Sequence, residues 1–185
     1  VQYLLPSLRL AALEHLRTIL VMTHDSIGLG EDGSTHQNVE NFSMIRALPN
    51  AYLIRPADLL ETSAAYAMAL SGPSAPYVIC LSRQTAPPVE GVSFDGVLKG
   101  GYLVHKAENP KVVLVGTGTE LKLAVDAATQ LGFEADVVSM PCMEVFKAQP
   151  EEYRKSVLRP GIPVISVEAG VTFGWESISH YHIGV

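Results

Sequence analysis

The stretch TILVMTHDSIGLGEDGSTHQ, residues 18–37, passes from a short apolar segment into a polar segment that is rich in glycine. Residues 18–23 are mostly apolar and partly β-branched, which is typical of a strand buried in a sheet. In α/β proteins, ligands bind beyond the carboxyl ends of the strands, and residues 24–37 would lie there. Two histidines and three acidic residues fall within residues 23–37. This stretch is therefore the leading candidate for a functional site.

Strand and helix patterns alternate along the rest of the chain. Further short apolar runs predict strands at 51–55, 77–81, 112–115, 135–139 and 163–167. Helical spacing of apolar residues predicts helices at 5–16, 39–48, 58–70, 120–131 and 149–158. The alternation indicates an α/β fold of two units, each with a mainly parallel sheet flanked by helices. The stretch 85–104 contains prolines and glycines and is expected to be a linker between units at 1–84 and 105–185.

Composition excludes several classes of protein. The 185 residues are 48% apolar and carry a net charge of −6, from 13 Lys+Arg and 19 Asp+Glu. That apolar content is too high for a disordered chain, and the negative balance argues against general nucleic-acid binding. No apolar run approaches the roughly 20 residues of a membrane span. The chain begins at Val1 in a segment that resembles a helix, and it is expected to be a piece of a longer protein.

The two cysteines are expected to be structural. Cys80 lies inside a predicted apolar strand, and Cys142 has only Glu144 as a charged neighbour. A nearby carboxylate would raise the pKa of the Cys142 thiol, which argues against a catalytic role. Two isolated thiols do not form a disulfide framework, so a reducing compartment is expected.

Three glycines in the polar stretch have the spacing of a dinucleotide-binding motif, Gly28-x-Gly30-x-x-Gly33, and Asp58 follows 25 residues later. A pyrophosphate binds where a helix N-terminus provides positive potential. Here two acids fall within the turn, and five polar residues separate Gly33 from the next apolar helix face. The motif alone is weak evidence, so this interpretation is the least favoured.

Two other interpretations of the polar stretch involve its ionisable side chains. His24, Asp25, Asp32 and His36 could form a metal site, although no HxxxH or CxxC spacing supports one. Alternatively, the histidines and an aspartate could hydrogen-bond the hydroxyl groups of a substrate. The interpretation of the stretch as a solvated loop without a function also stays open. Two imidazoles beside a carboxylate at a strand end favour the substrate site.

Two arginines also follow predicted strands. Arg83 comes after the strand at 77–81, and its guanidinium would suit a phosphate group at the ligand-binding edge. Arg55 precedes a helix start in which Asp58 can be the cap, so a structural role is expected for it. The turn at 116–120, GTGTE, has capping-box spacing between its first threonine and its glutamate.

Residues 23–40, THDSIGLGEDGSTHQNVE, closely resemble the transketolase signature THDSIGxGEDGPTHQPxE. The resemblance continues through the RPAD sequence at 55–58, LSRQ at 81–84, KGGY at 99–102 and GTGTE at 116–120. Because order and spacing agree over nearly all 185 residues, the chain is identified as a member of the transketolase family.

The resemblance implies a fold and an activity. Residues 1–84 would be the later part of a pyrimidine-binding domain with the thiamine-diphosphate-binding fold, and residues 105–185 a truncated C-terminal domain. Members of the family transfer a two-carbon ketol unit from a ketose phosphate to an aldose phosphate in the pentose phosphate pathway. They use thiamine diphosphate and Mg²⁺, and their active site lies at the interface of a cytoplasmic homodimer. The metal and diphosphate site and the catalytic glutamate would lie upstream of Val1, so the chain alone is expected to be inactive.

The resemblance also implies roles for individual residues. His24 is similar to a histidine near the phosphate of the acceptor, and Asp32 to an aspartate that bonds the acceptor's C2 hydroxyl. His36 is similar to a catalytic and substrate-binding histidine beside the cofactor aminopyrimidine. Arg83 matches a phosphate-binding arginine, and Tyr3 an aromatic residue of the pyrimidine-ring pocket. None of these residues is expected to bind a metal.

The chain departs from the family pattern at a few positions. Ser34 and Asn38 replace two usual prolines, which should loosen the loop. The sequence LLPS at 4–7 replaces a stretch of small residues and weakens the placement of Tyr3. Such changes leave open a formaldehyde-using transketolase (dihydroxyacetone synthase), which would be peroxisomal. Another thiamine enzyme or a non-catalytic transketolase-like protein also stays open.

Overall fold

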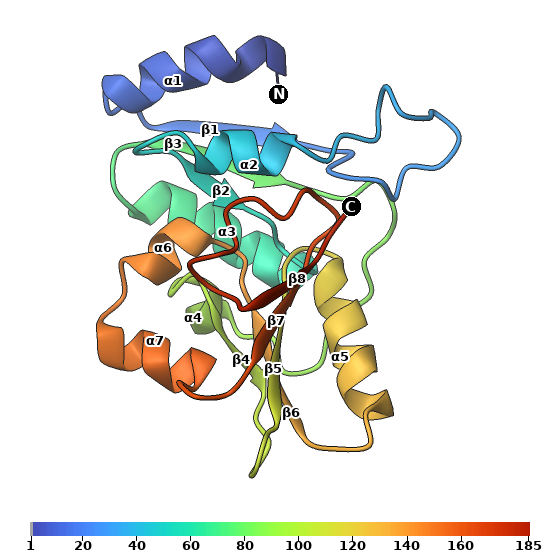
Figure 1. The fold of residues 1–185 in the computed structure, drawn as a ribbon. Helices are drawn as coiled ribbons and strands as arrows, with labels where there is room; N and C mark the ends of the chain where they lie inside the picture. The colour runs from blue at the N-terminus through green and yellow to red at the C-terminus, as the bar shows by residue number, and fades with distance from the viewer. Residues whose placement is uncertain (1) are drawn as a thin grey trace.

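The structure is a computed structural model that describes residues 2–185. Figure 1 shows two α/β units stacked on each other. The first unit contains, in chain order, the elements η1 (Gln2–Leu4), α1 (Leu5–Leu13), β1 (Thr18–Met22), α2 (Asn41–Arg46), β2 (Tyr52–Ile54), α3 (Leu59–Ser71) and β3 (Pro76–Cys80). Its strands form a parallel sheet in the order β1-β3-β2.

Helices cover both faces of this first sheet. Leu8 of α1 and Phe42 of α2 pack with Val78 of β3 on one face. On the other face, Ala65 and Met68 of α3 are in the cluster that contains Ile79. All five residues of β3 are buried, as expected for the central strand of a sheet with helices on both sides.

The second unit contains α4 (Phe94–Val97), β4 (Tyr102–His105), β5 (Val112–Gly116), α5 (Glu120–Gln130), β6 (Ala135–Ser139), α6 (Met143–Lys147), α7 (Glu151–Leu158), β7 (Val164–Val167) and β8 (Tyr181–Ile183). Its sheet has the order β4-β6-β5-β7-β8. Only β4 is antiparallel to its neighbour among the strands that the structure describes. Helix α5 packs on one face, and α6 and α7 pack on the other.

The α/β fold with mainly parallel sheets is confirmed, and each strand predicted from an apolar run is present. Sequence reasoning missed α4, β4, α6 and β8. The stretch 85–104, expected as a linker, is not free of structure, because it contains α4 and the first part of β4. These elements are three to five residues long, which is too short to show a clear periodicity.

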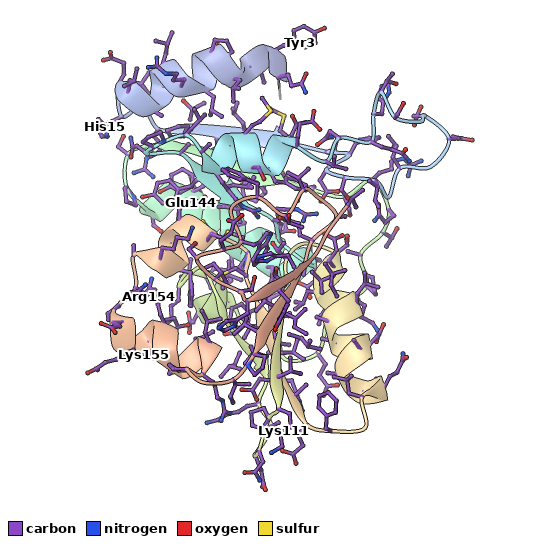
Figure 2. The ribbon with its side chains drawn as sticks, in the orientation of Figure 1. Tyr3, His15, Lys111, Glu144, Arg154 and Lys155 are labelled. Atoms are coloured by element: carbon purple, nitrogen blue, oxygen red, sulfur yellow. The ribbon has the colours of Figure 1, made fainter. Side chains whose placement is uncertain are left out.

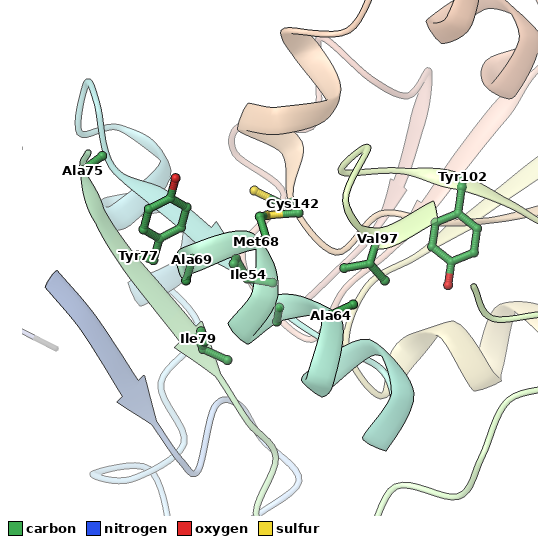
Figure 3. Close-up of a cluster of buried hydrophobic side chains, with 11 residues drawn as sticks. Ile54, Ala64, Met68, Ala69, Ala75, Tyr77, Ile79, Val97, Tyr102 and Cys142 are labelled. Atoms are coloured by element: carbon green, nitrogen blue, oxygen red, sulfur yellow. The ribbon is translucent and has the colours of Figure 1, made fainter. Parts of the chain in front are cut away.

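The apolar core is continuous between the two units. Figure 3 shows one cluster in which Met68 of α3 and Ile54 of β2 lie near Val97 and Cys142 of the second unit. A buried carboxylate lies at the same junction: Glu61 accepts hydrogen bonds from the hydroxyls of Tyr102 and Ser139, both at 2.6 Å. The units therefore share a buried junction.

Gly100 provides a test of the packing inside the second unit, because it has a positive φ of +82° and the Cβ of an alanine would lie 2.3 Å from the backbone nitrogen of Phe146. Gly161 is a matched control, with φ of +89° and open space around it. We expect Gly161→Ala to cost about 1–2 kcal/mol for its backbone conformation alone. Gly100→Ala should cost about 1–3 kcal/mol more because rigid backbone must move. Urea unfolding measures both, and equal losses would contradict the proposed crowding.

Candidate functional site

The polar stretch forms a long loop between β1 and α2, and it projects from the body of the molecule (Figure 1). Its outer part turns at two glycines with positive φ, Gly30 at +86° and Gly33 at +72°. The amide of His36 donates to the carbonyl of Gly33 at 3.0 Å. Within residues 23–38, only Asp25 and Ser26 are buried. The loop is thus anchored near its start and exposed beyond it.

Backbone contacts place the segment after β3 beside this loop. The amide of Asp25 donates to the carbonyl of Leu81 at 3.2 Å, and the amide of Leu81 donates to the carbonyl of Met22 at 2.7 Å. Gly28 lies so close to Gln84 that a Cβ there would meet its side-chain amide at 2.4 Å. Because β1 and β3 are adjacent and parallel, the loop and Arg83 share one edge of the sheet.

Four of the predicted site residues, His24, Asp32, His36 and Arg83, have exposed side chains. The Nδ1 atom of His24 is 3.0 Å from the hydroxyl oxygen of Thr23, and that of His36 is 2.9 Å from the hydroxyl oxygen of Thr35. Each imidazole therefore uses Nδ1 with the preceding threonine, so Nε2 is the ring nitrogen suited to a ligand. The backbone of His24 has a positive φ of +60°. Such a conformation is uncommon in a non-glycine residue, and His15, Asn50 and Arg159 share it here.

Tyr3, the predicted cofactor-binding residue, belongs to η1 and is not part of this loop. It is fully exposed, and Figure 2 shows it at the amino-terminal end of α1 with its ring directed away from both sheets. Its neighbour Gln2 donates to Glu40 Oε1 at 2.6 Å, at the far end of the loop. The start of α1 therefore lies near the loop, while the role of Tyr3 remains a prediction.

Two of the open interpretations of the loop are not supported by its geometry. The dinucleotide motif is wrong, because Gly33 is followed by turns and the next helix, α2, begins only at Asn41. Asp25 is not available as a ligand of the hypothetical metal site, because it is buried and paired with Arg55. Among residues 2–185, no group of three or more His, Cys, Asp or Glu side chains could hold a metal ion.

The buried anchor of the loop belongs to an ionic network that sequence reasoning did not predict. The side chain of Arg55 is completely buried at the end of β2. Its Nη2 donates to Asp25 at 2.7 Å, and its Nη1 contacts Glu120 at 2.9 Å and Glu168 at 3.0 Å. Asp25 comes from the first unit and both glutamates from the second. The structural role expected for Arg55 is confirmed, but its partners are distant in sequence.

A second arginine extends the network. Arg46 of α2 binds Glu168 through two hydrogen bonds of 2.6 and 2.7 Å, and the indole of Trp175 donates to the same carboxylate at 2.7 Å. Burial alone would raise the pKa of Glu168, but Arg46, Arg55 and Trp175 lower that pKa to about 2. Burial would lower the pKa of Arg55, and its three carboxylates raise it above the ordinary value instead.

The turn at 116–120 joins this network and does not form the predicted capping box. The helix α5 has Thr119 as its N-cap residue, without a side-chain bond to the helix backbone. Glu120 is held by Arg55 and accepts from the amide of Ala169 at 3.2 Å. The hydroxyl of Thr117 is buried and has no hydrogen-bond partner among the described residues. The ion pair with Arg55 therefore outweighs local capping.

Both cysteines are buried, as predicted. Burial is the main cause that raises the pKa of Cys80 to about 12. Burial and then the neighbouring Glu144 raise the pKa of Cys142, whose thiol donates to that carboxylate at 3.4 Å. Thiols with raised pKa values are poor nucleophiles, so both residues are structural.

One pocket of the molecule lies away from the loop. A pocket of about 390 Å³ lies between α2, β2 and α6 and is lined by residues such as Arg46, Tyr52 and Glu144. It adjoins the amino-terminal end of β2, whereas the loop and Arg83 follow the carboxyl ends of β1 and β3. The predicted site residues thus lie on an exposed edge.

Two family models match the chain. The transketolase pyrimidine-binding domain matches residues 1–88, and the transketolase-like C-terminal domain matches residues 100–185. Transketolase 1 of Candida albicans is 49% identical over 100% of this chain and 28% of the relative. The chain therefore spans a little over a quarter of the length of the curated relatives it matches.

Solved structures agree with this likeness. The transketolase of Leishmania mexicana has a TM-score of 0.97 and 53% identity, covering 100% of this chain and 28% of that protein. A transketolase of Pichia stipitis in complex with sedoheptulose-7-phosphate has a TM-score of 0.98 and 45% identity, with the same two coverages. The described part of the chain has no helix long and apolar enough to cross a membrane.

The ionic network predicts how stability depends on pH. Glu168 has an ordinary pKa of 4.5 and a folded pKa of about 2. A lowered folded pKa stabilises the fold above the unfolded value, and this contribution is lost as pH falls from about 4.5 toward 2. We expect Glu168→Gln to be less stable at neutral pH and to lose less stability between pH 6 and pH 3, by about 2 kcal/mol. Urea unfolding at pH 3 and pH 6 measures the difference.

The exposed Glu151, which pairs with Lys155 at 2.6 Å, provides the control for this experiment. Glu151→Gln should keep the acid dependence of the unsubstituted protein, because solvent screens an exposed ion pair. An unchanged acid dependence in Glu168→Gln would show that the network does not hold this carboxylate ionised.

Proposed function

Because the chain belongs to the transketolase family, we propose that the protein containing it transfers a two-carbon ketol unit from a ketose phosphate to an aldose phosphate. One observation carries this proposal: exposed imidazole, carboxylate and guanidinium groups occupy the same edge of a parallel sheet. A phosphorylated polyol needs hydrogen-bond acceptors and donors for its hydroxyl groups and a cationic group for its phosphate. The complex of the Pichia stipitis relative with sedoheptulose-7-phosphate agrees with this class of substrate. We place the reaction in the pentose phosphate pathway.

We propose separate roles for the exposed residues. Arg83 binds a substrate phosphate, because a guanidinium can donate two parallel hydrogen bonds to it. His24 is a substrate-binding residue near the phosphate of the acceptor. Asp32 accepts a hydrogen bond from the C2 hydroxyl of the acceptor, since an ionised carboxylate can only accept. His36, in the catalytic role, bonds the reacting hydroxyls of the donor.

Thiamine diphosphate and Mg²⁺ are the cofactors that we propose for the whole protein. The exposed imidazole of His36 suits the polar groups at the ring end of the cofactor, and we propose that the exposed Tyr3 contacts the cofactor ring in the whole protein. When bound, thiamine diphosphate supplies the nucleophilic carbon and the electron sink for ketol transfer. We propose that metal and diphosphate bind outside residues 1–185, so that this chain alone is inactive.

We also propose that the active site is completed at the interface of a homodimer. The support is the exposure of the site residues, which face solvent on a projecting loop. A second surface would shield them from water, as the chemistry of the site requires. We propose a cytoplasmic location, supported by two buried cysteines that form no disulfide.

The direct test uses the full-length protein with thiamine diphosphate and Mg²⁺. Xylulose 5-phosphate labelled with ¹³C at its first two carbons is supplied with ribose 5-phosphate. Breaking the C2–C3 bond of the donor and forming a bond to the aldehyde carbon of the acceptor should give a doubly labelled seven-carbon ketose. A parallel assay supplies formaldehyde as the acceptor. Transfer to formaldehyde but not to ribose 5-phosphate would favour a dihydroxyacetone synthase, and no transfer in either assay would favour a non-catalytic protein.

Arg83→Ala should raise the KM for phosphorylated acceptors far more than for glycolaldehyde. A charge-assisted hydrogen bond contributes about 1.5–3 kcal/mol, which corresponds to roughly 10- to 150-fold in binding. The loss should appear in KM because the phosphate is remote from the reacting carbons. Arg9→Ala, which changes an exposed arginine of α1, is the control. Equal effects on both acceptors would remove Arg83 from the phosphate site.

Asp32→Ala should reduce discrimination between ribose 5-phosphate and its 2-deoxy analogue. A site that bonds a hydroxyl disfavours the analogue without it, because its own polar group is left unpaired. We expect kcat/KM for the 2-hydroxy acceptor to fall roughly 5- to 150-fold, the equivalent of about 1–3 kcal/mol, with little change for the deoxy acceptor. Glu31→Ala, at the adjacent exposed carboxylate, should leave the ratio unchanged. A constant ratio with a lower melting temperature in Asp32→Ala would indicate a structural role.

A further inference from the structure

The loop that carries the proposed substrate-binding residues depends on one buried charged contact near its start. Asp25 is the only ionisable residue of 23–38 that is buried, and it directly follows His24. The positive φ of His24 is an unfavourable conformation that persists only where neighbouring contacts hold it. Asp25 therefore gives the loop a fixed point directly beside His24.

Arg55 holds Asp25 through one arm of its guanidinium. Nη2 donates to Asp25 Oδ2 at 2.7 Å, while Nη1 faces Glu120 and Glu168 on the other side. The guanidinium also stacks on the ring of Phe42, with 4.0 Å between its Cζ and the ring centroid. Each arm of the planar group thus has its own partners, and its orientation is fixed.

The second unit binds the Nη1 arm of the guanidinium, so it determines the direction of the Nη2 arm that holds Asp25. Glu120 begins α5 and Glu168 follows β7. The backbone of Arg55 is tied to the same unit: its amide donates to Pro141 at 2.9 Å, and its carbonyl accepts from Gly118 at 3.0 Å. At the far end of the loop, the carbonyl of Val39 accepts from the amide of Val171 at 2.9 Å. The far end of the loop is therefore attached to the second unit directly, and its start is attached through Arg55.

We propose that Arg55 is a positioning residue that acts through Asp25 to hold His24 and the substrate-binding loop in their binding geometry. The proposal rests on the proposed function for the identity of the substrate. It assigns the second unit a part in substrate binding, although none of the predicted substrate-binding residues belongs to that unit. Arg55 itself does not touch substrate, because its side chain is completely buried.

Arg55→Lys tests the proposal because a lysine keeps the charge but lacks the fork of donors. A single ammonium cannot span Asp25 on one side and two glutamates on the other, so we expect it to stay with the glutamates. Arg46→Lys is the matched control. Arg46 binds the same Glu168, and its side chain is only 9% exposed, but among the described residues its ion pair is with Glu168 and does not involve Asp25.

Three readouts on the full-length protein separate positioning from stability. For Arg55→Lys we expect at least a tenfold rise in KM for ribose 5-phosphate, and at least tenfold faster hydrogen exchange of the amides in 23–38. Arg46→Lys should lower the melting temperature but leave KM and loop exchange within twofold. Matching changes in both variants, or unchanged loop exchange in Arg55→Lys, would overturn the proposal.

A double-mutant cycle supplies the second test. Asp25→Ala should reproduce the losses of Arg55→Lys, and the double variant should be no worse than either one, because the two residues act as a unit. Additive losses would overturn the proposal. If Arg55→Lys fails to fold, Asp25→Asn takes its place, since it leaves Arg55 with both glutamates. If the unsubstituted protein shows no ketol transfer, the proposed function fails, and the exchange measurement still decides whether Arg55 anchors the loop.

Discussion

One fully buried guanidinium constrains the arrangement of this molecule. Removing an ion from water is costly, and a buried charge is tolerated only when it is paired and hydrogen-bonded. Arg55 meets this condition with three carboxylates from three different segments, Asp25, Glu120 and Glu168. Moving any one of these segments away would remove a charged contact of 2.7–3.0 Å from the buried network. The two units are therefore fixed relative to each other by electrostatics as well as by their shared apolar core.

This constraint allows a rigid anchor and an open loop to coexist. The buried start of the loop is fixed by Arg55, whereas its outer part turns at Gly30 and Gly33 and exposes His36. Binding residues commonly lie on loops that a rigid scaffold positions. Here the scaffold includes the second unit, because Glu120 and Glu168 set the orientation of the arginine. The outer part of the loop can thus be exposed to solvent while the start of the loop keeps a fixed position.

The buried carboxylates of the junction fall into two electrostatic classes. Glu168 lies beside two arginines, and its pKa is lowered to about 2. Glu61 has only neutral donors, the hydroxyls of Tyr102 and Ser139 and the amide of Ala57, and burial raises its pKa. Burial penalises the charged form in both cases, and the presence or absence of a cation decides the direction.

The sequence by itself determined the α/β class, the position of each main parallel strand and the family, because apolar runs and a continuous signature are local patterns. It also placed the candidate site at the ends of β1 and β3, since parallel strands share a carboxyl edge. The short elements α4 and β4 were missed because they are stabilised by distant residues: Val97 packs in a cluster with Met68, and Tyr102 donates a hydrogen bond to Glu61. The partners of Arg55 lie 30 or more residues away in the chain. Only the tertiary structure could bring these charges together, because an ion pair depends on distance in space and leaves no spacing in the sequence.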